Sequence, residues 1–88
     1  MKTIKLRGEL IKIKYESPSV VKLLFKDEEE DIYYLTLTKM FLNLKKRFET
    51  GKKVDILVVL QCFIRTVENR KYYQNDLQVI SVTEVSNQ

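Results

Sequence analysis

The chain has 88 residues, of which 44% are hydrophobic and 32% charged; this leaves room for one folded domain over residues 1–88 and excludes a disordered chain. It lacks the ~20 apolar residues of a membrane span and the apolar run of a signal peptide, and its single cysteine, Cys62, excludes an internal disulfide, so we expect a cytoplasmic protein without membrane contact. The net charge is +4, but five of the acids lie together in residues 27–31, so the rest of the chain is strongly basic, which favours a polyanionic partner as well as plain solubility.

The first half of the chain follows the period of β-strands. Residues 3–15 alternate between apolar and polar side chains, with a change of phase near Gly8 that puts Ile11, Ile13 and Tyr15 on the inner face and predicts a bent or bulged strand. A turn with Pro18 follows. Residues 20–26 and 32–38 predict a second and a third strand, and the self-repelling acids of residues 27–31 predict the connection between them.

The period changes in residues 39–50. Their apolar residues are spaced as on one short amphipathic α-helix, and three cations lie near its end, where they favour the helix dipole. Thr38 is the expected N-cap and Gly51 the expected stop after the helix. The predicted apolar stripe consists of Met40, Phe41, Leu44 and Phe48.

Two more strands complete the pattern, in residues 54–67 and from residue 72 to about residue 82. Residues 56–60 are apolar on both faces, so we expect Leu57 and Val59 to face another subunit. Alternation places Cys62, Ile64 and Tyr73 inward, and Tyr33 in the core as well. Residues 85–88 are expected to fray.

Three strands, a helix and two strands form the element order of the five-stranded OB-fold, an all-β barrel with one helix between its third and fourth strands. An open α+β sandwich has the same order without closure. The bend in the first strand favours the barrel, because a strand in a small closed sheet must turn a corner.

Residues 41–79 resemble the second half of bacterial single-stranded DNA-binding proteins and the related primosomal replication proteins. The features shared are a helix ending in lysine and glycine, the pair Arg65 and Thr66, a polar turn, and the aromatic-polar-acidic start of the last strand at Tyr73, Asn75 and Asp76. The opening IKLRGELIKI is similar to the first strand of that family. The resemblance implies an OB-fold that binds single-stranded DNA in replication or recombination, as a homodimer or higher oligomer with replication proteins as partners. This sequence lacks the tryptophans with which the family stacks bases.

The stretch IRTVENRKYY, residues 64–73, combines cations with aromatic rings, which are the two groups that binding of single-stranded nucleic acid requires. Alternation places Phe63, Arg65 and Tyr72 outward on a hairpin, and Tyr34 outward on the third strand. Lysines of the first two strands would extend the cationic track, and Tyr15 would cap it. The candidate nucleic-acid-binding residues are therefore Tyr34, Phe63, Arg65, Arg70, Lys71, Tyr72, Lys12, Lys14 and Lys22.

Nothing in the sequence predicts an enzyme. The chain has no histidine, which is the commonest general base, and Cys62 in an apolar strand is expected to be a small core residue. The acidic run lacks the spacing of a calcium loop, and two distant glycines make no phosphate loop, so we expect no metal and no cofactor. Two alternatives stay open: the partner is single-stranded RNA, or the barrel is a protein interaction subunit of a larger complex.

Overall fold

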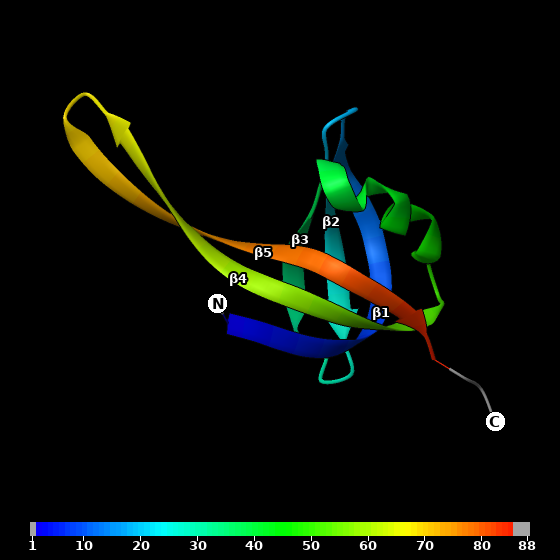
Figure 1. Ribbon diagram of the computed structural model, residues 1–88. Coiled ribbons are helices and arrows are strands. Elements are labelled where there is room, and N and C mark those ends of the chain that lie inside the picture. Colours follow the sequence, from blue (N-terminus) through cyan, green and yellow to red (C-terminus); the bar gives the residue numbers. More distant parts are fainter. Residues whose placement is uncertain (1, 86–88) are drawn as a thin grey trace.

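The computed structural model describes residues 2–85, and the expected fraying of residues 86–88 lies outside that range. Its strands close a barrel in the order β1-β2-β3-β5-β4, with a helix between β3 and β4, which confirms the predicted OB-fold (Figure 1). All neighbouring strands are antiparallel except β3 and β5. The elements are β1 (Lys2–Glu16), β2 (Val20–Asp27), β3 (Ile32–Thr38), η1 (Lys39–Arg47), β4 (Lys53–Val67) and β5 (Arg70–Glu84).

β1 is long enough to pair with two different strands. Its first half pairs with β4 and its second half with β2, and the two ladders overlap at Gly8 and Glu9. The ladder with β2 has two register shifts, between Leu10 and Lys12 and between Ile13 and Tyr15. The predicted bend is therefore present, but the second shift turns Tyr15 outward, so the expected inward position of this tyrosine is wrong.

Apolar side chains of all five strands fill the barrel. The buried positions alternate along β2, as a sheet with one face on the core requires, whereas Leu35, Thr36 and Leu37 of β3 are all buried. Phe48, just after the helix, is buried in this core and meets Phe25 edge to face, with ring centroids 6.2 Å apart. Tyr33 packs against this core, as predicted.

The helix differs from the prediction in type and in orientation. It is a 3₁₀ helix whose last hydrogen bond runs from the Phe48 N–H to the Lys45 carbonyl. Leu44 and Phe48 of the predicted stripe do pack against the core. Leu42 packs there too, although it was not predicted to, and Met40 is 82% exposed. Thr38 makes no side-chain capping bond, and Gly51 (φ +83°) lies in a later turn.

The outer halves of β4 and β5 form a hairpin that projects from the barrel as a twisted ribbon (Figure 1). Its tip is a two-residue turn of Glu68 and Asn69, both with positive φ, which matches the twist of the flanking strands. Residues 62–75 are all exposed, on both faces of the ribbon. We call this segment the projecting hairpin.

At the barrel end of β4, Val59 is 4% exposed, so the expectation that it faces another subunit is wrong. Its neighbours on β1 and β5, Thr3 and Gln78, flank it within the sheet. Leu57 is half-buried. At the other end of the chain Val85 donates a hydrogen bond to the Lys53 carbonyl. Among the described residues, no helix is long and apolar enough to cross a membrane.

Candidate nucleic-acid interface

Side chains of all five strands share one outer face of the sheet. Strand pairing aligns Lys12 with Leu24, Leu24 with Tyr34, and Asp76 with Gln61. Between β3 and β5, Thr36 pairs with Gln78, and continuing this register by one residue places Tyr34 beside Asp76. Because paired residues point to the same side, these strands form one continuous surface, which we call the outer face.

The outer face continues onto the projecting hairpin without a break. Beyond the pair of Gln61 and Asp76, every second pair of the β4–β5 ladder has the same orientation. These pairs are Phe63 with Gln74, Arg65 with Tyr72, and Val67 with Arg70. The front of the hairpin is therefore an extension of the outer face of the barrel.

Three aromatic residues on this surface are exposed to solvent. Tyr34 and Tyr72 are each 50% exposed and Phe63 is 43% exposed. The ammonium group of Lys22 stands 5.5 Å from the centroid of the Tyr34 ring, a distance typical of a cation–π contact. The three aromatic residues thus point outward, as alternation predicts.

Arginines surround the ring at the outer end of the face. Arg65 is the cross-strand partner of Tyr72, and Arg70 lies two residues before Tyr72 on the same side. A shallow hollow is lined by Arg65, Val67, Tyr72, Tyr73 and Gln74. The hollow therefore combines a ring with a guanidinium group.

Only two of the four predicted lysines are placed on the outer face by strand pairing. Lys12 lies on the outer face because it pairs with Leu24 of β2, and Lys22 of β2 lies there because it pairs with Thr36 of β3. Lys14 lies at a register shift and has no partner residue on β2. Lys71 is paired with Thr66, so it lies on the back of the hairpin, opposite to Tyr72. The structure does not bring Lys71 together with the other cations.

Three residues expected in the core are exposed on the back of the hairpin. Tyr73 is 71% exposed and Ile64 is 61% exposed, and Cys62 is also exposed. Alternation assigns them correctly to the side that faces the barrel interior. They are nevertheless uncovered, because the hairpin extends past the last strand that could pack on that side.

A polar group that the sequence pattern did not predict lies at the centre of the outer face. It consists of Thr36, Gln61, Gln74, Asp76 and Gln78. The Thr36 hydroxyl donates to Asp76 at 2.8 Å, and the Gln78 amide donates to the other carboxylate oxygen at 3.3 Å. Extending the alternation from Tyr72 along β5 would have found Gln74 and Asp76.

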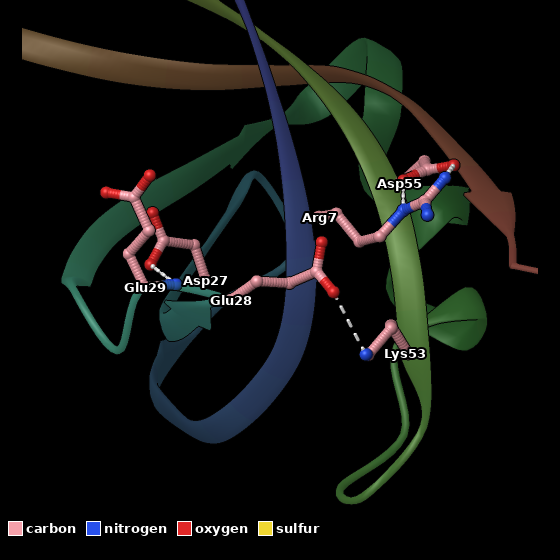
Figure 2. A network of polar contacts seen from close by, with 6 residues as sticks. All are labelled: Arg7, Asp27, Glu28, Glu29, Lys53 and Asp55. Atoms are coloured by element: carbon pink, nitrogen blue, oxygen red, sulfur yellow. Dashed lines mark hydrogen bonds and ion pairs between the residues drawn. The ribbon is translucent and has the colours of Figure 1, made fainter.

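The acidic connection of residues 27–31 has a local structural role. The Asp27 carboxylate accepts hydrogen bonds from the backbone N–H groups of Glu29 and Asp31 and from the Tyr33 hydroxyl. Figure 2 shows Glu28 reaching Lys53 of β4 at 3.1 Å. Burial raises the pKa of Tyr33, and its hydrogen bond to Asp27 and the neighbouring acids add to the rise.

Next to this connection, Arg7 of β1 binds Asp55 of β4 through two hydrogen bonds of 2.6 and 3.0 Å (Figure 2). The hydrogen bond and the charge of Arg7 lower the pKa of Asp55. Among residues 2–85, no cluster of acidic and cysteine side chains has the arrangement of a metal site.

Comparison with known proteins supports the fold. No family model matches the chain, and no curated protein sequence matches it. Among solved structures, the crystal structure of the mitochondrial single-stranded DNA-binding protein Rim1 from S. cerevisiae is similar, with a TM-score of 0.65. The match covers 98% of this chain and 95% of that one at 11% sequence identity. This chain therefore has an OB-fold similar to that of a single-stranded DNA-binding protein.

Proposed function

We propose that this protein binds single-stranded DNA in replication or recombination, without catalysis. The observation that carries the proposal is the outer face, on which the exposed rings of Tyr34, Phe63 and Tyr72 lie in one surface with cations at both ends. Bases would stack on the rings, while Lys12, Lys22, Arg65 and Arg70 neutralise phosphates. The similarity to a single-stranded DNA-binding protein supports the same reading.

The test is a titration of labelled single-stranded DNA of mixed sequence, the matching RNA and the matching duplex, each at two salt concentrations. Tyr72→Ala should weaken binding to the single strand by about 5- to 150-fold, because one stacked base is worth roughly 1 to 3 kcal/mol. Met40→Ala is the control, since Met40 is also an exposed apolar residue but lies on η1, outside the outer face. Tyr34→Ala should resemble Tyr72→Ala.

Binding should weaken steeply with salt, because each phosphate contact releases a counterion. Equal binding to duplex and single strand, or equal losses in the Tyr72 and Met40 variants, would contradict the proposal. Tighter binding to RNA than to DNA would change the proposed partner and leave the surface unchanged, because stacking does not depend on the 2′-hydroxyl.

A second candidate function is protein interaction, and the back of the hairpin favours it. Ile64 and Tyr73 form an exposed apolar cross-strand pair there. Such a pair fits a protein partner or a second copy of this chain, in line with the expected homo-oligomer. Light scattering of the free protein and of Tyr73→Ala tests self-association: an oligomer that Tyr73→Ala dissociates supports this use of the surface, and a monomer in both cases contradicts binding of a second copy.

A further inference from the structure

The centre of the outer face has a different chemistry from its ends. Cations stand on the barrel side, at Lys12 and Lys22, and on the hairpin side, at Arg65 and Arg70. The row between them contains Tyr34, Asp76 and Gln61, and Gln74 follows on the hairpin. A strand of nucleic acid that crosses this surface would thus meet a carboxylate midway, beside an exposed ring.

The carboxylate of Asp76 is fixed in place but retains free acceptor capacity. Thr36, whose side chain is buried, donates to one oxygen, and Gln78 donates to the other. An ionised carboxylate has about four lone-pair positions, of which these contacts use two. Asp76 itself is half-buried, so part of the residue remains accessible to solvent.

A fixed carboxylate in this position distinguishes the parts of a nucleotide. It repels phosphates, which the cations at both ends attract. It accepts hydrogen bonds from the exocyclic amino groups of cytosine, adenine and guanine. Thymine and uracil present a carbonyl oxygen where cytosine has its amino group, so a carboxylate directed at this position meets a second acceptor and is repelled.

We propose that Asp76 is a specificity-determining residue, which reads the edge of a base stacked on Tyr34 or Phe63 and favours bases with an amino group over thymine and uracil. Thr36 and Gln78 are positioning residues, because they orient the carboxylate. The inference rests on the proposed function and gives it a base preference that ring stacking alone does not provide.

The test compares oligodeoxycytidine with oligodeoxyuridine of equal length, because these bases have similar ring size and neither carries a methyl group. Wild-type protein should bind the cytidine strand about tenfold more tightly, as expected of one charge-assisted hydrogen bond. Asp76→Asn should bring the ratio of the two affinities to one or below, since the new amide can donate to the uracil carbonyl. The side-chain amide of Gln78 can rotate to keep its contact with the new residue.

Glu49→Gln is the matched control, since it changes the charge equally at an exposed position outside the outer face. It should leave the ratio at the wild-type value. A measurement on the wild-type protein gives independent evidence: N4,N4-dimethylcytidine lacks the donor hydrogens, so its oligomer should bind about tenfold more weakly than oligodeoxycytidine.

Equal binding of the cytidine and uridine strands by wild-type protein, a ratio that survives Asp76→Asn, or undiminished binding of the dimethylated strand would each overturn the role of Asp76. These results leave binding to single strands intact. If neither strand binds at low salt, the proposed function itself is wrong. The role of Asp76 in base preference would then be wrong as well.

Discussion

Gly8 is the residue at which β1 changes its partner strand. It pairs with Asp27 of β2 and with Val54 of β4, so neighbouring backbone approaches it from both sides. A Cβ atom at this position would lie 1.9 Å from the Lys26 carbonyl oxygen. Only glycine fits such a contact, because the obstructing atom belongs to the backbone and cannot rotate away.

We therefore expect Gly8→Ala to lower the free energy of unfolding by about 3 kcal/mol or more, the upper end of the cost of overpacking. Gly51→Asn is the comparison. Gly51 has φ +83° and open space around it, and asparagine tolerates this conformation, so this change should cost less than about 1 kcal/mol. Urea denaturation measures both, and similar costs for the two variants would contradict the steric argument.

Tyr33 gives the protein a dependence on alkaline pH. Its pKa is raised by burial first and by the hydrogen bond to Asp27 and nearby acids second, so the folded state holds the phenolic proton more tightly than the unfolded state. The resulting stability is fully present below the unfolded pKa of about 10 and is lost as pH rises through the folded value. Above pH ~10, wild-type stability should fall more steeply than that of Tyr33→Phe. Equal slopes in thermal unfolding would refute this.

At the scale of elements, the projecting hairpin contributes surface rather than core. None of its side chains is buried, although its strands continue those of the barrel. A two-stranded ribbon is only marginally stable in water, so its order depends on the barrel at its base and on the tight turn at its tip. The hairpin therefore serves to extend the outer face.

Shortening the hairpin tests this separation. Phe63 pairs with Gln74, so an Asn-Gly turn can replace residues 64–73 and keep the register. The free energy of unfolding should change by less than about 1 kcal/mol, because no buried side chain is lost. Affinity for single-stranded DNA should fall at least about tenfold with the loss of Tyr72. The salt dependence should also become shallower by about 0.7 per lost phosphate contact. An unfolded variant, or one with unchanged affinity, would contradict the assignment.

At the scale of the whole molecule, strand period and turn chemistry were sufficient to predict the order of elements and the barrel. The outward side chains of Tyr34, Phe63 and Tyr72 were predictable for the same reason, since alternation survives wherever pairing is regular. Burial was less predictable: Tyr73 has the pattern of a core residue but lies beyond the barrel. The position of Tyr15 depends on a register shift in β1, and the type of the helix depends on its tertiary contacts. Neither feature is encoded in the local sequence.

Two ion pairs on the barrel surface connect segments that are distant in the sequence. We expect them to make the stability of the molecule sensitive to acid. Asp55 is bonded to Arg7 across β1 and β4, and Glu84 to Lys52 at 2.5 Å. Arg7 lowers the pKa of Asp55 and Lys52 lowers the pKa of Glu84, in each case chiefly through the hydrogen bond. The stability that each pair contributes is present above the unfolded pKa of the carboxyl group, near 4, and is lost as pH falls through the lower, folded value.

Asp55→Asn should therefore flatten the decline of melting temperature below pH ~4. Glu49→Gln should not flatten it, since Glu49 has no ion pair among the described residues. An acid limb that keeps its slope in Asp55→Asn would show that other carboxylates cause the decline.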